Sequence, residues 1–261
     1  MLPENELPLR LEELAWSAIA QLQNEGHDFL ILPLGATEQH GPHLPINTDS
    51  LIATRICEFA SAKTKTPVLP CQTYTVSEGH TAKWPGTFSV RHETFIHLIG
   101  DLTRWVVATG WKRLLLVNSH FGNDASLRVA VDQLRLRHLG ELQIGVLNTF
   151  QLSPEIWAEF TSDANDLHAN KSETDLMLYL APETVRMDRV EDDPDRTEGT
   201  VFSYPVSQTS LNGLTGKPSL GNVEDGERLF LKMGNRLAEL VERAKTESPP
   251  LEPELWQGTS A

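Results

Sequence analysis

The stretch DFLILPLGATEQHGPHLPINTD, residues 28–49, joins a short apolar run to a polar block. The run at residues 28–35 ends in Gly35 and has the composition of a strand that is buried on both faces. The polar block contains four side chains that can bind a metal or carry a proton: Glu38, His40, His43 and Asp49. Such residues gather at the carboxyl ends of strands in open α/β sheets, so the stretch predicts a buried strand that leads into a functional site.

Predicted strands and helices alternate along most of the chain. Further buried strands are predicted at residues 112–120 and 142–150, and a weaker one at 66–71, where two prolines interrupt the run. Apolar spacing predicts helices at residues 10–24, 49–62, 91–110, 123–140, 172–181 and about 224–245. We expect Gly110 to end one of these helices, and Asn123 and Ser172 to cap two others. The alternation indicates an α/β protein with a mostly parallel sheet and helices on both faces.

Length and composition set the class of protein. The chain has 261 residues and no repeat or linker that would divide it, so we expect residues 1–261 to form a single α/β domain. The formal net charge of -14 argues against nucleic acid or an anionic membrane as a partner. No apolar run approaches the ~20 residues of a membrane helix. The N-terminal sequence MLPENELPLRLEEL lacks the apolar core of a signal peptide.

Three other features complete this part of the prediction. Cys57 and Cys71 are not at metal-ligand spacing, and we expect reduced thiols in a cytoplasmic protein. The acidic stretch at residues 189–200 is expected to be a solvated loop. The Pro-rich tail from about Glu247 is expected to be extended and to lie on the body or on a neighbouring subunit through Trp256.

Two further polar clusters lie next to predicted strands and helices. NSHFGN at residues 118–123 contains His120, and DLHANKSETD at residues 166–175 contains His168 and Glu173. The combined ligand set is Glu38, His40, Asp49, His120 and Glu173. Carboxylates and imidazoles together suit zinc, manganese or iron(II) better than calcium or magnesium. Three carboxylates favour two divalent ions with a bridging hydroxide, and Asp49 is the expected bridge because its two oxygens can be shared.

Each cluster alone also has a structural interpretation. A Glu-x-His pair is common by chance, His40 could cap a turn, and His120 could be a half-buried histidine at a strand end. Three clusters at strand–helix junctions together favour a site. The remaining histidines are interpreted as ordinary core or surface residues: His27, His92, His97 and His138.

The segment SEGHTAKWPGTFSV, residues 77–90, could form a pocket wall or an ordinary packed loop. A tryptophan beside a tight Pro-Gly-Thr turn fits either interpretation. The expected substrate-binding residues are Ser77, His80, Trp84 and Phe121.

The blocks LPLGATEQHGPHLPINTD, WPGTFSV, NSHFGN and HANKSETD, in this order, resemble the creatininase (creatinine amidohydrolase) family over about residues 31–175. The resemblance implies a three-layer α/β/α sandwich, two divalent metal ions and a hexameric ring. Zinc is expected first, with manganese or iron as alternatives. It implies that Glu38, His40, Asp49 and His120 bind the metals, that Asp49 bridges them, and that His168 transfers a proton at the scissile nitrogen. Glu173 matches a glutamate of the last block.

The chain departs from the family pattern at several positions. In creatininases an aromatic residue and then a metal-binding glutamate follow the histidine of the third block, whereas here Phe121 and Gly122 follow it. We expect Glu173 to complete the second metal site instead. Asn170 stands where glycine is usual and Asp175 where serine is usual, and one additional residue separates His80 from Trp84.

These features together predict a metal-dependent amidohydrolase. We expect a hydroxide held by two metals to attack a cyclic or linear, non-peptide C–N amide bond of a small molecule, while His168 donates a proton to the leaving nitrogen. Two alternatives stay open. One is a deformylase or peptidase on the same site. The other is a degenerate member that binds a metal or ligand without turnover, which the glycine at position 122 keeps open.

Overall fold

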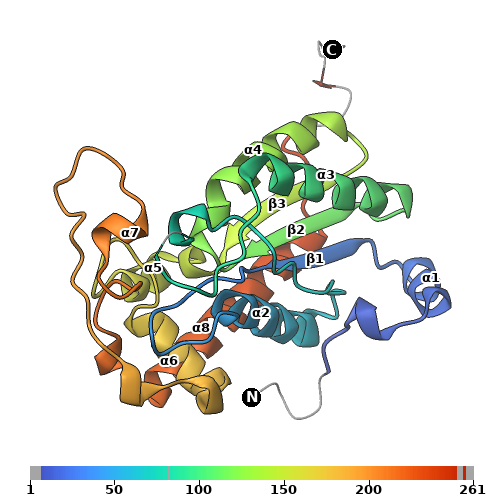
Figure 1. The fold of residues 1–261 in the computed structure, drawn as a ribbon. Coiled ribbons are helices and arrows are strands. Elements are labelled where there is room, and N and C mark those ends of the chain that lie inside the picture. Colours follow the sequence, from blue (N-terminus) through green and yellow to red (C-terminus); the bar gives the residue numbers. More distant parts are fainter. Residues whose placement is uncertain (1–6, 82, 252–254, 257–261) are drawn as a thin grey trace.

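The computed structural model describes residues 7–81, 83–251 and 255–256 (Figure 1). The start of the N-terminal stretch, residues 1–6, lies outside the described residues. So do residues 252–254 and 257–261 of the predicted tail. The tail begins against the sheet, where the Gln143 side chain donates a hydrogen bond to Glu247 O at 3.0 Å. Within the tail, Trp256 Nε1 donates to Leu251 O at 2.9 Å.

The sheet contains three parallel strands in the order β1-β2-β3: β1 (Phe29–Leu34), β2 (Arg113–Asn118) and β3 (Gln143–Asn148). These confirm the three strands predicted with the clearest apolar runs. Every residue of β1 is buried, as a strand covered on both faces requires. Leu34 pairs with Asn118, and Asn118 with Asn148, so the three strands end at the same level. Polar residues that follow different strands are thereby brought to one edge.

The strand predicted at residues 66–71 is wrong in extent. Val68 forms only isolated bridges, to Arg10 and to Ile31, although the segment runs beside β1. Ile31 N–H donates to Pro67 O at 3.0 Å. Pro67 and Pro70 have no N–H to donate, which prevents a continuous ladder.

The helices lie on both faces of the sheet, which confirms the three-layer α/β/α architecture (Figure 1). One core joins β1 and β2 to α2 (Thr48–Thr64), α6 (Lys171–Leu180) and α8 (Val223–Lys245). The other joins the opposite faces of the same strands to α3 (His92–Ala108) and α4 (Asp124–Arg137). The predicted helix at 10–24 begins later, as α1 (Trp16–Asn24), after a 3-10 turn at Leu11–Glu13. Two short helices were not predicted: α5 (Pro154–Phe160) and α7 (Val206–Thr209).

The helix ends differ from the predicted caps. Gly110 has φ 94°, as expected for a glycine that terminates a helix, but it follows Thr109, which occupies the C-cap itself. Asn123 does not cap α4 through its side chain. Its amide instead donates to Gly35 O at 3.0 Å and ties the end of β1 to α4. Asn170 rather than Ser172 caps α6, accepting from Glu173 N–H at 3.2 Å. The buried Ser172 hydroxyl donates to Glu159 O.

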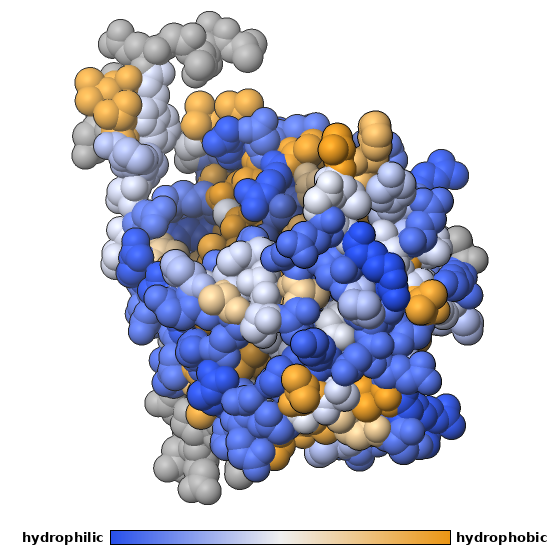
Figure 2. All heavy atoms as spheres, turned by 90° about the vertical axis from the view of Figure 1, so that its left-hand side faces the viewer, coloured by the Kyte–Doolittle hydropathy of each residue, from blue (hydrophilic) through white to orange (hydrophobic). Residues whose placement is uncertain are grey.

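The surface view in Figure 2 is mainly hydrophilic, with hydrophobic atoms in scattered patches. No helix within the described residues is long and apolar enough to cross a membrane. Cys57 is buried and Cys71 partly exposed, and both are free thiols. The acidic stretch at 189–200 is not wholly solvated, because Asp193 is buried and accepts hydrogen bonds from Ser210 Oγ and Leu211 N.

Close packing of α6 against α8 depends on Gly226. A Cβ at this position would overlap the carbonyl oxygen of Asp175. We expect Gly226→Ala to lower the free energy of unfolding by about 1–3 kcal/mol, because one helix must move away from the other. Urea unfolding monitored by circular dichroism measures this.

The matched control is Gly100→Ala in the middle of α3, where a Cβ would meet nothing within 4 Å. Alanine favours a helix over glycine by about 1 kcal/mol, so this variant should gain stability. Equal stabilisation by both substitutions would show that the helices are not in the close contact described.

Candidate metal centre

The candidate site lies at the carboxyl ends of β1 and β2. Glu38 and His40 follow β1, Asp49 lies in the first turn of α2, and His120 comes two residues after β2. Glu173 lies in the first turn of α6, which His168 precedes. The structure therefore brings all five residues predicted as ligands, together with His168, to one buried region. The charged side chains are almost inaccessible, with 0% exposure for Glu38, 2% for Asp49 and 5% for Glu173.

Asp49 faces two histidines through its two oxygens. Its Oδ1 lies 3.2 Å from His40 Nε2, and its Oδ2 lies 3.0 Å from His120 Nδ1. Each oxygen thus belongs to a different carboxylate–imidazole pair. A carboxylate shared between two cations requires this arrangement.

Backbone carbonyls fix the proton on each of three histidines. His40 Nδ1 donates to Glu38 O at 3.0 Å, and His120 Nε2 donates to Val76 O at 2.7 Å. His168 Nε2 donates to Gln39 O at 2.9 Å. A carbonyl only accepts, so in each neutral ring the other nitrogen carries no proton. This orientation by a hydrogen bond to the far ring nitrogen is typical of metal-ligating histidines.

The nitrogens that are unprotonated in the neutral rings point at carboxylate oxygens. His40 and His120 face Asp49, and His168 Nδ1 lies 3.2 Å from Glu38 Oε1. Both oxygens of Glu38 and Oδ2 of Asp49 are buried without a hydrogen-bond partner within the described structure. Two facing lone pairs repel unless a cation lies between them. Unpaired buried carboxylates are also costly. The donor set therefore fits divalent metal ions.

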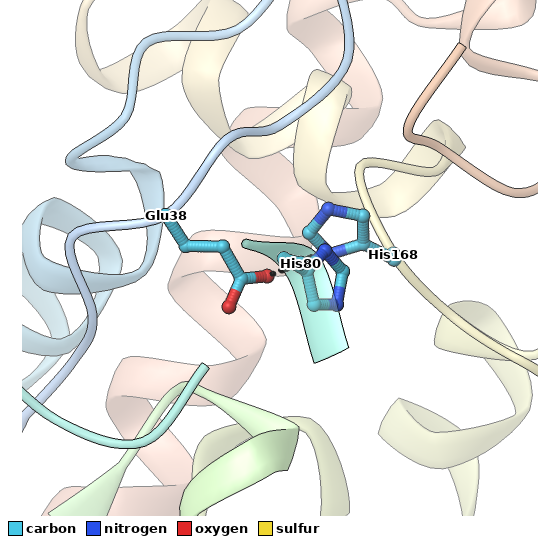
Figure 3. Close-up of side chains that lie close together, drawn as sticks. All are labelled: Glu38, His80 and His168. Atoms are coloured by element: carbon cyan, nitrogen blue, oxygen red, sulfur yellow. Dashed lines mark ion pairs between the residues drawn. The ribbon is translucent and has the colours of Figure 1, made fainter. Parts of the chain in front are cut away.

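Three overlapping groups have ligand atoms that lie within 4.8 Å of one another. The groups are Glu38–His40–Asp49, His40–His168–Glu173 and Glu38–His80–His168. Figure 3 shows the last of these, in which both histidine rings approach the Glu38 carboxylate. Overlap of the groups through shared residues is consistent with more than one ion.

The pKa values of the site also indicate that its buried carboxylates favour positive charge next to them. Burial alone would lower the pKa of His40, but the Asp49 carboxylate, aided by Glu173 and Glu38, outweighs it and raises the pKa to about 10. At His120, burial also lowers the pKa, but the carboxylates of Glu38 and Asp49 outweigh it and raise the pKa to about 9. Without metal, protons on these two rings take the place of the cations. Burial raises the pKa of the Glu173 carboxyl to about 7.

His168 behaves differently from the other two histidines. Burial, and the neighbouring His80 and His40, hold its pKa well below the ordinary value. The ring therefore stays neutral near pH 7, with a bare Nδ1.

The turn before α6 is strained in a way that orients Glu173. Ala169 has φ 49°, which is uncommon for a residue with a Cβ. Its N–H donates to Glu173 Oε2 at 2.5 Å. Asn170, which replaces the usual family glycine, caps the helix and also donates to Phe160 O at 2.7 Å. Backbone strain of this kind concentrates at functional sites.

Of the residues predicted to bind substrate, Ser77 and His80 contact candidate metal ligands, whereas Trp84 and Phe121 have other neighbours. Ser77 Oγ lies 3.2 Å from His120 Nε2, and His80 Nδ1 lies 3.4 Å from Glu38 Oε1. His80 thus belongs to a potential ligand group rather than only to a pocket wall. Trp84 is half-buried with Lys83 Nζ 4.7 Å from its ring, and Phe121 is 57% exposed and packs on Phe150.

Two residues of the first polar block, His43 and Gln39, make contacts that the sequence did not indicate. His43 is buried, but its Nε2 contacts Thr174 Oγ1 at 2.9 Å, away from the ligand groups. Gln39 was not singled out, yet its buried amide lies 3.0 Å from His80 Nδ1 and 2.8 Å from Gly213 O. Gly213 is 174 positions away in the sequence, so no local pattern could have revealed this contact.

Gly122 occupies a position without space for a side chain. A Cβ there would lie 2.5 Å from His120 Nε2 and 2.7 Å from Val76 O. A glutamate at this position would therefore require His120 to move. The local packing therefore leaves no room for a metal-binding side chain at position 122.

The fold and the site define the class of this protein: a three-layer α/β protein with a buried histidine–carboxylate centre at the ends of its strands. The profile of the family described as "Creatininase: Creatinine amidohydrolase" matches residues 12–241. The chain therefore belongs to the creatininase family of amidohydrolases.

Two relatives show the range of activities in that family. A "Mycofactocin precursor peptide peptidase" of Mycobacterium ulcerans (strain Agy99) is 32% identical over 85% of this chain and 88% of its own length. A "Creatinine amidohydrolase" of Pseudomonas putida is 28% identical over 91% of this chain and 96% of its own length.

Solved structures give the same family and include metal forms. A tryptophan-to-phenylalanine variant of creatininase has a TM-score of 0.81 and 27% identity, covering 92% of this chain and 100% of its own. A "Zn-Zn type" creatininase variant has a TM-score of 0.78 and 26% identity, over 92% of this chain and 99% of its own. A structure titled "Creatininase Mn" has a TM-score of 0.79 and 26% identity, over 92% and 100%.

Proposed function

We propose that the chain is a metal-dependent amidohydrolase that holds two divalent ions and cleaves a C–N amide bond. One observation carries the proposal: three buried histidines each give one ring N–H to a backbone carbonyl and turn the other nitrogen toward a carboxylate. Such pairs support metal binding, and the match to a family described as creatinine amidohydrolase supports amide hydrolysis at that metal centre.

The ligand assignment follows the geometry of Asp49. Asp49 would share its two oxygens between the ions, and Glu38, His40, His120 and Glu173 would supply the other ligands. Zinc or manganese fits the donors, and both occur in the titles of related creatininase structures. Bound ions would lower the pKa of a water molecule and polarise the amide carbonyl.

His168 would move the proton. Its Nδ1 is bare and its Nε2–H is held by Gln39 O, so Nδ1 is the atom that can accept a proton from the attacking water. The same atom would then donate that proton to the leaving nitrogen. The ring enters the reaction unprotonated, as this first step requires.

The substrate is a small amide in our first proposal, as for creatinine amidohydrolase. A peptide amide is the second candidate, because a relative at 32% identity is named a peptidase. The departures at Gly122, Asn170 and Asp175 are consistent with a substrate other than creatinine. The hexamer and the cytoplasmic location remain predictions from family resemblance and composition.

Metal content and turnover together test the proposal. Protein purified without chelator should contain about two transition-metal ions per chain by elemental mass spectrometry. The zinc-loaded and manganese-loaded chains should hydrolyse at least one amide in a panel of creatinine, N-formyl compounds and short peptides. Chelator-stripped protein is the control.

Three outcomes separate the alternatives. Failure to bind zinc or manganese would contradict the metal assignment. Two bound ions with no turnover on any class of amide would favour the degenerate, non-catalytic alternative. Turnover of peptides alone would correct the substrate in favour of the second candidate.

A further inference from the structure

Gln39 stands between two proposed ligands, Glu38 and His40, but its own side chain contacts other parts of the site. The side chain is buried, at 4% exposure. Its Oε1 accepts from Gly41 N–H at 3.0 Å. Its Nε2 lies 2.8 Å from Gly213 O, 3.0 Å from His80 Nδ1 and 3.2 Å from His168 Nε2.

One assignment satisfies both hydrogens of this amide. One hydrogen is donated to Gly213 O, which only accepts. His168 Nε2 already donates its proton to Gln39 O at 2.9 Å, so it cannot accept from the amide. The second amide hydrogen therefore goes to His80 Nδ1. His80 consequently accepts at Nδ1 and carries its own proton on Nε2.

We propose that Gln39 is a positioning residue whose side-chain amide sets the tautomer and ring orientation of His80. Its backbone carbonyl orients His168, and its side-chain amide orients His80. The two rings lie 4.2 Å apart between centroids, at 57°. Both turn Nδ1 toward the same atom, Glu38 Oε1, at 3.4 Å for His80 and 3.2 Å for His168 (Figure 3). The consequence for turnover rests on the function proposed above.

Gly213 holds the Gln39 amide in place. Its φ is 88°, and a Cβ at this position would overlap Gln39 Oε1. Two further hydrogen bonds fix the loop that contains Gly213. Gly213 N–H donates to Ser210 Oγ at 2.9 Å, and Ser210 Oγ donates to the buried Asp193 at 2.8 Å. The three atoms nearest to such a Cβ all belong to the Gln39 amide group, so a methyl group at 213 would displace that amide first.

This geometry allows a double-variant experiment on the zinc-loaded chain. Gln39→Ala should lower kcat about 10- to 100-fold, as expected for loss of a partner that orients a functional histidine. KM and zinc content should stay near those of the unmodified chain. Gly213→Ala should lower kcat similarly. Because it acts through Gln39, the double variant should be no slower than Gln39→Ala alone.

The matched control is Gly199→Ala. Gly199 has a similar φ of 77°, but a Cβ there would meet nothing within 4 Å. It therefore reproduces the backbone strain of Gly213→Ala without the overlap, and its kcat should be unchanged. Multiplying effects in the Gln39→Ala/Gly213→Ala variant would overturn the action of Gly213 through Gln39.

A readout without turnover separates this proposal from the proposed function. Nitrogen-15 spectra of histidine-labelled, zinc-loaded chain should show His80 as a single tautomer protonated on Nε2, and a mixture of tautomers in Gln39→Ala. His80 is assigned by its loss in His80→Asn. An unchanged His80 signal in Gln39→Ala would overturn the proposal, even if no amide is hydrolysed. Wild-type kcat in Gln39→Ala would also overturn it.

Discussion

Asp49→Ala is expected to remove both metal ions and all measurable amide hydrolysis. Asp49 turns its two oxygens toward two different histidines, His40 and His120, through the ring nitrogens that do not bond a backbone carbonyl. A substitution that removes both oxygens takes a ligand from each proposed ion. Metal content should fall from about two ions per chain to near zero, measured by elemental mass spectrometry after gel filtration.

The substitution should leave the fold intact. Glu38 remains beside His40 and His120 and keeps a buried carboxylate next to the protons that these rings carry without metal. Circular dichroism and the thermal midpoint check this directly. Asp132→Ala is the control, because Asp132 is 62% exposed on α4 and should affect neither metal content nor turnover.

Partial metal loss would have a specific meaning. Retention of one ion would make Asp49 a ligand of a single metal. Retention of both ions would refute the assignment of Asp49 as the bridge.

His168→Ala is expected to lower kcat about 10²- to 10⁴-fold while both metals stay bound. The ring is neutral near pH 7, and its bare Nδ1 is the atom proposed to receive and return the proton. KM should change much less than kcat, because the substitution removes a proton carrier rather than a substrate contact. Steady-state kinetics and metal analysis of one preparation measure both quantities.

The competing role for His168 is metal binding, since two of the three potential ligand groups include it. Loss of one ion in His168→Ala would assign it that role. His97→Ala, at an exposed position of α3, is the control and should retain both metals and full activity.

Local sequence predicted the elements whose signal is local. The three apolar runs became β1, β2 and β3 because a strand covered on both faces needs uninterrupted burial. The weak strand at 66–71 remained a set of bridges because its prolines lack donors. Asn123 occupies the predicted N-cap position without a side-chain cap hydrogen bond, and the cap predicted at Ser172 was wrong. Side chains of this kind have several partners within reach, and the surrounding fold selects among them.

The candidate ligands were also indicated by the sequence. Two of the three clusters follow β1 and β2, whereas the third, with His168 and Glu173, lies between α5 and α6 and not after a strand. Parallel strands that end at the same level necessarily bring the first two clusters together. Tertiary structure alone decided how each ring is turned. His40, His120 and His168 are oriented by backbone carbonyls, and His80 is oriented by Gln39, which Gly213 holds from 174 positions away. The amino-acid sequence alone therefore identified the candidate ligands. The proton and direction of each imidazole depend on hydrogen bonds that exist only after distant segments have packed.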